Sequence, residues 1–371
     1  MAVVRGHRAN VGELASYAEV LREFDVTYFF TGRTPAECRR DLNDLGLERV
    51  AAYRYRSYTD LVSLGPLGPL VDFKLGFASW MLSGVREALA HDVINVVDPI
   101  YRFASQLARA MRPEQKLVVV RWEIIPNRYA DVLGGRARAA RVLARADGIV
   151  CATDAARQSL VLGSAAAARV EVIHPGVRMP AQAAAPVVEP EPRIVTVARL
   201  QWQKGLDDLI AAVALLRRCH GVPARLTVIG GGNDGPWRRL VRSYDLGEDV
   251  EFTGALPAAE VRRRLAQAVV YCQPSATSRT WCEQFGFAVV EAMAGGRPVV
   301  TCATGVLPEI VGPDGVYAPA RNAAGLAQAL ADVLRDPRAA ADRGRRLQAR
   351  ARERYDAARQ GTALLDFFRA L

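Results

Sequence analysis

Short apolar runs alternate with longer helical stretches along most of the chain. In the first half, the runs with the β-branched composition of buried strands are residues 2–4, 26–30, 93–97, 116–122 and 148–153. Helical patterns, for example at 12–24 and 100–111, separate these runs. Because parallel strands need a crossover connection, the alternation predicts a parallel sheet with helices on both faces.

A proline-rich segment interrupts this alternation. Residues 179–193 hold four prolines and no periodic apolar pattern, which predicts a linker, and strands and helices resume after it. We therefore predict a first domain at 1–178, a second at 194–355, and a last helix at 356–371 that can pack on the first domain. Two doubly wound, Rossmann-like α/β domains of this kind are expected to face each other across a cleft at the carboxyl ends of their strands.

The composition argues against several classes of protein. Half of the 371 residues are hydrophobic and 24% are charged, which is unlike a disordered or fibrous chain. No apolar span reaches about 18 residues, and the start lacks the apolar core of a secretory signal, so we predict a cytoplasmic protein without a transmembrane helix. The six cysteines show no C-x-x-C spacing and the four histidines are scattered, so reduced thiols and no metal or cofactor are expected.

The net charge of +10 favours an anionic partner. Apart from three lysines the basic residues are arginines, scattered along predicted helix faces and not interleaved with aromatic residues. This pattern favours solvated helix faces over nucleic acid binding. The apolar segment 64–84, which contains Phe77, Trp80 and Met81, is either a buried helix and loop or a surface for peripheral contact with a membrane or a lipid acceptor.

Two cations bracket a loop in the second half of the chain. Arg199 and Lys204 lie between a strand that ends at Ala198 and a helix that Gly205 opens. Cations at the carboxyl end of a strand, next to a helix N-terminus, suit a diphosphate. The alternative is a surface loop with solvated charges.

Two glutamates flank a glycine in the segment 280–300. Glu283 precedes Gly286, at which a helix is predicted to begin, and Glu291 lies one to two turns inside that helix. A helix start is electropositive and glycine has no Cβ, so a phosphate or sugar could approach closely. The carboxylate of Glu291 could accept hydrogen bonds from both hydroxyls of a ribose. The alternative is a core helix with one capping and one solvated acid.

A glycine cluster at 230–232 follows a predicted strand but lacks the G-x-G-x-x-G spacing of a dinucleotide site. Gly230 either lets a ligand approach the backbone or only turns the chain.

The segment 283–300 resembles the E-x7-E motif of retaining GT-B glycosyltransferases, particularly those of family 4. The resemblance continues in the same order through residues 197–210, 228–232, 250–256 and 305–311. It implies a GT-B fold and transfer of a sugar from a nucleoside diphosphate sugar to a hydroxyl acceptor, with retention at the anomeric carbon. A glycan, a lipid-linked compound or a small molecule is the expected acceptor.

The resemblance also assigns roles to residues. The groups expected to be catalytic are Arg199 and Lys204, which would hold the donor diphosphate, and Glu283, which would contact the transferred sugar without a proven role as nucleophile. Glu291 would bind the nucleotide ribose. The remaining donor-binding residues would be Phe285, Gly286 and Phe287, through their backbone, together with Gly230, Leu307 and Glu309.

The first half resembles the family more weakly. Many family members carry a histidine after the strand that corresponds to residues 116–122, whereas this chain reads Arg121-Trp122-Glu123. Polar residues at the ends of two other predicted strands are Asp98 and Asp154, each either a helix cap or a substrate contact. The acceptor-side candidates are therefore Gly12, Asp98, Trp122, Glu123 and Asp154.

Two other functions stay open on the sequence. One is an epimerase-like GT-B enzyme, which handles sugar nucleotides without transfer. The other is a non-catalytic module that binds nucleotides or an anionic surface.

Overall fold

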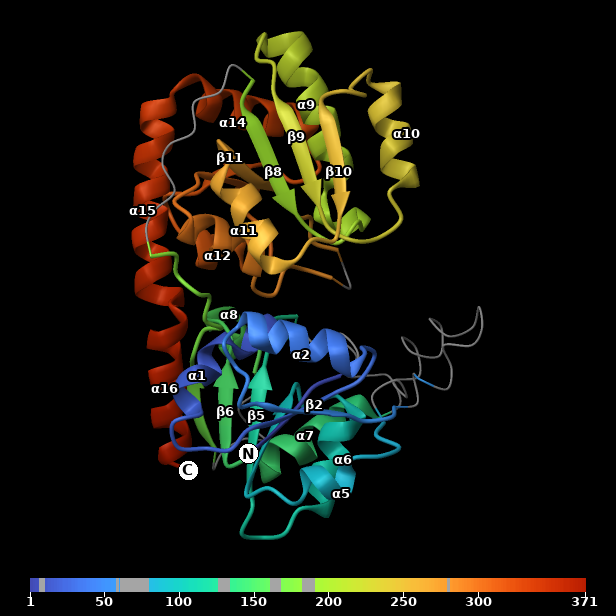
Figure 1. The fold of residues 1–371 in the computed structure, drawn as a ribbon, viewed down its shortest axis with the longest axis vertical. Helices are drawn as coiled ribbons and strands as arrows, with labels where there is room; N and C mark the ends of the chain where they lie inside the picture. The colour runs from blue at the N-terminus through green and yellow to red at the C-terminus, as the bar shows by residue number, and fades with distance from the viewer. Residues whose placement is uncertain are drawn as a thin grey trace. The chain divides into compact units, whose positions relative to one another are not determined.

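A computed structural model describes residues 1–6, 11–57, 60, 80–125, 134–160, 168–181, 191–278 and 281–371. The chain divides into two compact units. Unit 1 comprises Met1–Gly176 and Ala357–Leu371, and unit 2 comprises Val177–Asp356. The chain therefore leaves unit 1 once and returns to it for its last helix (Figure 1). Most of the predicted linker, residues 182–190, lies outside the described residues.

Unit 1 is built on a parallel sheet with the order β3-β2-β1-β4-β5-β6-β7 among the described residues. Its strands are β1 (Ala2–Val4), β2 (Thr27–Phe30), β3 (Ala51–Arg54), β4 (Val93–Val97), β5 (Lys116–Arg121), β6 (Gly148–Cys151) and β7 (Arg169–Val172). The five predicted strands are confirmed, whereas β3 and β7 were not predicted. Both are edge strands with partly exposed residues, so they lack the apolar run that marks a central strand.

Helices cover both faces of this sheet because successive residues of a strand point to opposite sides. Val118 and Val120 of β5 pack in one cluster, and Leu117 and Val119 pack in the other. The first cluster is covered by η1 (Val11–Ser16), α1 (Tyr17–Val20), α2 (Pro35–Asp44) and α16 (Ala357–Arg369). The second is covered by α5 (Val85–Ala88), α6 (Arg102–Ala110), α7 (Gly135–Arg145) and α8 (Asp154–Gln158).

Helix α16 packs beside α1 and η1, so the two ends of the chain share one core (Figure 1). Phe367 and Phe368 are buried in the cluster that contains Tyr28 and Val118. Gly361 is buried at the contact, and a Cβ there would collide with the carbonyl oxygen of Ser16. The glycine therefore allows the close approach of the helix.

Unit 2 contains a second parallel sheet with the order β10-β9-β8-β11-β12-β13. Its strands are β8 (Arg193–Val197), β9 (Arg225–Ile229), β10 (Val250–Gly254), β11 (Val270–Gln273), β12 (Val299–Cys302) and β13 (Val316–Ala318). The strand order reverses between β8 and β11, which is where open α/β sheets bind ligands. The two doubly wound parallel sheets confirm the predicted fold class, and the edge strand β13 is the one that the sequence missed here.

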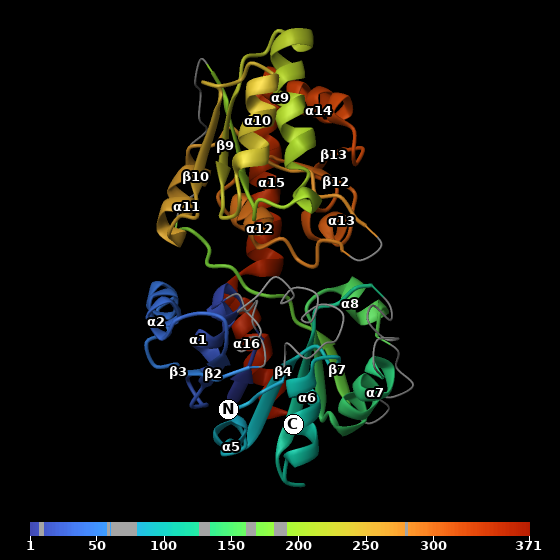
Figure 2. The same cartoon turned by 90° about the vertical axis from the view of Figure 1, so that its right-hand side faces the viewer.

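The helices of unit 2 also lie on two faces (Figure 2). The first group is α9 (Leu206–His220), α10 (Gly235–Ser243) and α14 (Ala323–Arg335), and α9 and α14 lie side by side. The other group is α11 (Ala258–Ala266), α12 (Phe287–Ala294), α13 (Leu307–Val311) and α15 (Pro337–Tyr355), and the short helix η4 (Trp202–Lys204) follows β8. No helix in the described part of the chain is long and apolar enough to cross a membrane.

Replacing Gly361 by alanine is expected to lower the stability of unit 1 by about 1–3 kcal/mol, because the new methyl group overpacks the contact with Ser16. Alanine has a higher helix propensity than glycine, which by itself would raise the stability, so a measured loss of stability must come from the overpacked contact. The measurement is the midpoint of urea unfolding. Thr362→Ala changes the exposed neighbouring position and should stay within about 0.5 kcal/mol of the wild type. Equal midpoints for the two variants would contradict the close docking of α16.

Candidate functional site

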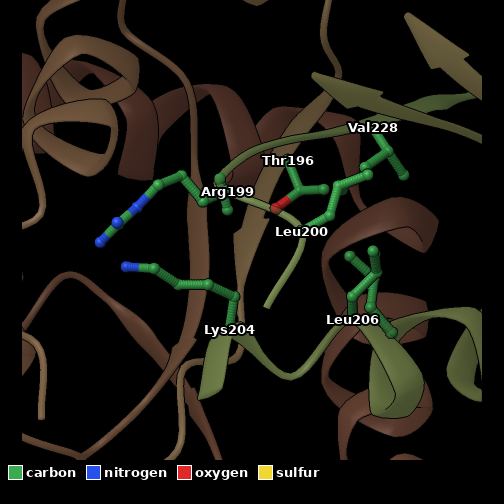
Figure 3. A pocket seen from close by; sticks show the side chains of 8 residues that line it. Thr196, Arg199, Leu200, Lys204, Leu206 and Val228 are labelled. Carbon is green, nitrogen blue, oxygen red and sulfur yellow. The ribbon is translucent and has the colours of Figure 1, made fainter. Parts of the chain in front are cut away.

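The two predicted cations lie together at the carboxyl end of β8. Arg199 follows the strand and is exposed, and Lys204 ends η4 and is half-buried. Their side chains extend in the same direction, away from the apolar residues behind them (Figure 3). A small pocket behind the two cations is lined by Thr196, Leu200, Leu206, Leu209 and Val228, among others. The geometry gives two positive charges on one side of a loop next to the first turn of α9.

Lys204 makes an ion pair with Glu283, 79 positions later in the chain. Nζ lies 2.7 Å from Oε2 of Glu283, and the side chains are only 14% and 11% exposed. The ammonium also lies 4.8 Å from the centre of the Trp281 ring, a cation–π geometry. This buried ion pair brings two predicted site residues together.

Two further side chains bind the same carboxylate oxygen, and the sequence reasoning missed both. Nε2 of Gln273 donates to Oε2 of Glu283 at 2.8 Å, and the hydroxyl of Ser275 donates to it at 3.2 Å. Gln273 is the last residue of β11. The available signal was a glutamine that ends an otherwise apolar strand and precedes Pro274 and Ser275.

Left-handed glycines bring the surrounding loops together. A Cβ on Gly205 (φ 67°) would collide with the carbonyl oxygen of Pro274, and a Cβ on Gly305 (φ 55°) would collide with that of Glu283. The backbone N–H of Val306 donates to the carbonyl oxygen of Glu283 at 3.2 Å. Loops that follow β8, β11 and β12 thus meet around one carboxylate.

Helix α12 begins where the sequence predicted. Gly286 is its N-cap in the left-handed region (φ 79°), and a Cβ there would meet the side chains of Val289 and Leu307 at 3.3–3.4 Å. Phe285 is buried and packs edge-on against Phe287, with ring centroids 4.9 Å apart. The backbone conformation, together with packing, therefore requires glycine at the start of α12.

Glu291 has a different environment from Glu283. It is half-buried on α12, and no hydrogen bond from the described residues reaches its carboxyl group. Burial raises the pKa of Glu291 to about 7, although the charge of Arg262 acts in the opposite direction. The carboxylate of Glu283 thus accepts from three donors, whereas the pKa of Glu291 lies close to neutral pH.

The other donor-side candidates contribute through packing and backbone in this structure. A Cβ on Gly230 (φ 148°) would collide with the carbonyl oxygen of Ala198, which gives a structural reason for that glycine. Leu307 is fully buried. Glu309 accepts a hydrogen bond from Arg350 at 2.6 Å through its backbone carbonyl oxygen.

Three of the five acceptor-side candidates meet in unit 1. Oδ1 of Asp98 accepts from the backbone N–H groups of Trp122 (3.1 Å) and Glu123 (3.3 Å), and it lies 3.4 Å from a guanidinium nitrogen of Arg121. Asp98 is buried with φ 37°, a strained value for a residue other than glycine. Burial raises the pKa of its carboxyl group, against the effect of Arg121. Asp98 thus holds the backbone at the end of β5 and is not a helix cap, since the N-cap of α6 is Tyr101, whereas a contact with the substrate stays a prediction.

The remaining first-half candidates lie apart from that cluster. Gly12 is half-buried in η1, and Asp154 is exposed in the first turn of α8. The N-cap of α8 is Thr153, whose hydroxyl accepts from the backbone N–H of Ala156 at 3.0 Å, so Asp154 is not the cap. His174 is buried, with Nδ1 3.0 Å from the carbonyl oxygen of Ala152.

Two solved structures share this fold. Sucrose-phosphate synthase from Thermosynechococcus elongatus matches with a TM-score of 0.74 at 19% identity, covering 100% of this chain and 98% of that one. Anabaena Alr3699/HepE in complex with UDP-glucose matches with a TM-score of 0.73 at 18% identity, covering 100% and 99%. The fold is thus the GT-B fold of glycosyltransferases.

Sequence similarity to known proteins is found in unit 2. Residues 180–354, a segment that contains Arg199, Lys204 and both glutamates, match the model of the family described as glycosyl transferases group 1. Glycogen synthase of Mycobacterium tuberculosis is 35% identical over 195 residues, or 51% of this chain and 45% of that protein.

The GDP-mannose-dependent alpha-(1-6)-phosphatidylinositol monomannoside mannosyltransferase of Mycolicibacterium smegmatis is 35% identical over 162 residues, 41% of each chain. The chain therefore spans less than half the length of these curated relatives.

Replacing Glu291 by glutamine tests the raised pKa. Since the folded state binds this proton more tightly than the unfolded chain, Glu291 should destabilise the fold increasingly as the pH rises from 4.5 to above about 7. Near pH 4.5 the E291Q variant should be as stable as the wild type, and at alkaline pH it should be more stable by up to about 3 kcal/mol. Urea unfolding across this pH range measures the difference. Glu248→Gln, at an exposed position of unit 2, is the control and should show no such trend.

Proposed function

We propose that the protein is a retaining glycosyltransferase that moves a sugar from a nucleoside diphosphate sugar to a hydroxyl acceptor. The observation that carries the proposal is the Lys204–Glu283 ion pair, which lies beside Arg199 inside the segment that matches glycosyl transferases group 1. The pair combines a cation suited to a diphosphate with a carboxylate that can accept a hydrogen bond from a sugar hydroxyl.

In the proposed reaction, negative charge grows on the diphosphate as its bond to the sugar breaks. Arg199, Lys204 and the N-terminus of α12 would stabilise that charge, and fixed groups of this kind supply much of the rate enhancement of many enzymes. These protein groups would provide the positive charge without a metal ion or other cofactor. Glu283 would orient the transferred sugar, and Glu291 would bind the two ribose hydroxyls.

The acceptor side of the proposal rests on unit 1. Asp98 holds the backbone of Trp122 and Glu123 where many family members have a histidine, so these residues are proposed to contact the acceptor. The relatives named above include a polysaccharide synthase and a lipid mannosyltransferase, which supports a glycan or lipid-linked acceptor. None of the six cysteines forms a disulfide in the structure, and we propose a reducing, cytoplasmic location.

The donor is identified by thermal unfolding with a panel of GDP-mannose, UDP-glucose and UDP-N-acetylglucosamine, with and without EDTA. A ligand at about 100 times its Kd should stabilise the folded protein by about 2.7 kcal/mol, and EDTA should not change this. Arg199→Ala should abolish most of the shift, whereas Arg239→Ala, an exposed arginine of α10, should retain it. The proposal fails if no sugar nucleotide or nucleoside diphosphate stabilises the wild type.

Turnover separates the remaining alternatives. A donor that is epimerised without an acceptor would favour the epimerase-like reading. A donor that binds and is not consumed with any acceptor would favour the non-catalytic module.

We also propose a peripheral contact of unit 1 with an anionic membrane. The exposed apolar side chains Trp80 (39%), Leu82 (47%) and Tyr101 (40%), together with the net charge of +10, support it. Met81 is buried, so it is not part of such a surface, and residues 64–79 of the predicted segment lie outside the described residues.

A flotation assay tests the membrane contact. Wild-type protein should float with vesicles of phosphatidylcholine and phosphatidylglycerol and less with phosphatidylcholine alone. Trp80→Ser with Leu82→Ser should reduce the bound fraction several-fold, because each exposed apolar side chain adds buried area. Trp202→Ser, an exposed tryptophan of unit 2, is the matched control. Equal binding to both kinds of vesicle, or none, would contradict the proposal.

A further inference from the structure

The carboxylate of Glu283 is held through one of its two oxygens. Oε2 accepts hydrogen bonds from Lys204, Gln273 and Ser275, at 2.7, 2.8 and 3.2 Å. No donor among the described residues reaches Oε1. Three donors on one oxygen fix the rotation of the carboxylate and leave the other oxygen able to accept a hydrogen bond from a ligand.

Gln273 is the donor that links this carboxylate to the sheet. It is 2% exposed, and its carbonyl Oε1 accepts a hydrogen bond from the hydroxyl of Tyr271 at 2.6 Å. Tyr271 and Gln273 are two positions apart on β11, so their side chains share one face of the strand. The hydroxyl of Thr301 on β12 donates to the backbone carbonyl oxygen of Gln273 at 2.7 Å. Strand β11 thus holds the glutamine through its backbone and its side chain.

The orientation of the Gln273 amide follows from its neighbours. Oε2 of Glu283 is the acceptor of the ion pair with Lys204, so the NH2 group of Gln273 faces Glu283 and its carbonyl oxygen faces Tyr271. Burial, followed by the charge of Glu283, raises the pKa of Tyr271, so its hydroxyl remains a donor. The hydroxyl of Tyr271 therefore donates to the carbonyl oxygen of the Gln273 side chain, and the NH2 group of Gln273 donates to Glu283.

Folding stability alone does not account for this arrangement. An apolar side chain would fill a buried strand position without needing any partner, and an unsatisfied amide there is costly. Here the two buried polar side chains of β11, Tyr271 and Gln273, are hydrogen-bonded to each other, and Gln273 donates to the carboxylate of Glu283. That carboxylate belongs to one of the residues that the family motif places at the transferred sugar.

We propose that Gln273, supported by Tyr271, is a positioning residue that turns Oε2 of Glu283 toward the protein and presents Oε1 to a hydroxyl of the donor sugar. The inference rests on the proposed glycosyltransferase function and adds to it a residue outside the motif. It predicts that Gln273 affects recognition of the sugar and leaves recognition of the diphosphate to Arg199.

The first test compares two ligands on Gln273→Met, an apolar side chain of similar length. The probes are UDP-glucose and UDP, or the corresponding pair for the donor that the thermal panel identifies. We expect the affinity for the sugar nucleotide and kcat to fall about 10- to 100-fold, the effect of losing a charge-assisted hydrogen bond. The affinity for the free nucleoside diphosphate should stay within about twofold of the wild-type value, because a change at one site usually has little effect on an independent site.

A matched control is available in the same unit. Gln348 is also buried, and it donates one hydrogen bond to the carbonyl oxygen of Ala294 at 2.8 Å, away from Glu283. Gln348→Met should leave the ratio of the two affinities unchanged. Tyr271→Phe removes the hydroxyl that holds the Gln273 amide and should change the ratio in the same direction as Gln273→Met, but less.

A second test replaces the amide by an acid of the same shape. In Gln273→Glu, two carboxyl groups would face each other beside Lys204 and Tyr271, so they would share a proton at acid pH. The protonated Glu at this position could then donate to Glu283 as the amide does. Sugar-nucleotide affinity of Gln273→Glu should therefore recover toward the wild type as the pH falls, whereas Gln273→Met should show no recovery.

The outcomes separate this inference from the function on which it rests. If wild type binds no sugar nucleotide, the proposed function fails first. If wild type binds and transfers, and Gln273→Met keeps the normal ratio of affinities, the positioning role is wrong and the function stands. A parallel loss of both affinities, together with a lower Tm, would instead show that Gln273 only supports folding.

Discussion

The carboxylate of Glu283 is nine-tenths buried and needs compensation for its charge, and the local structure of unit 2 follows from that requirement. Lys204 supplies the opposite charge from the loop after β8, and Gln273 and Ser275 add hydrogen bonds from the end of β11. Loops from three parallel strands must therefore approach within hydrogen-bonding distance. Gly205 and Gly305 permit this, because a Cβ at either place would collide with the backbone opposite.

The same helix start gives its two glutamates different chemistry. Glu283 lies before α12 and its Oε2 accepts hydrogen bonds from three donors, whereas Glu291 lies inside α12 and burial raises its pKa to about 7. Hydroxyl donors bound to Glu291 would favour its ionised form. Under the proposed function, Glu283 would orient the transferred sugar and Glu291 would bind the ribose.

Unit 1 repeats the architecture of unit 2 with different polar groups. Its sheet also reverses order, between β1 and β4, and Asp98 at the end of β4 binds the backbone at the end of β5. The strained φ of Asp98 is maintained by three hydrogen-bond donors on one oxygen. The candidate site of unit 2 is therefore built from charges and glycines, whereas in unit 1 one buried aspartate shapes the backbone around Trp122.

The sequence by itself determined the central strands and the start of α12 at Gly286, and it singled out the residues that we propose bind the diphosphate and the sugar. These depend on local periodicity and glycine placement, which a single chain displays. It missed the edge strands β3, β7 and β13, since edges are only partly buried and need no apolar run. Only the tertiary structure decided that Lys204 pairs with Glu283 and that Gln273 completes the group. Residues 79 positions apart become neighbours only when the strands assemble into a sheet, and the partner of a buried amide depends on the same assembly, so neither contact can be predicted from one sequence.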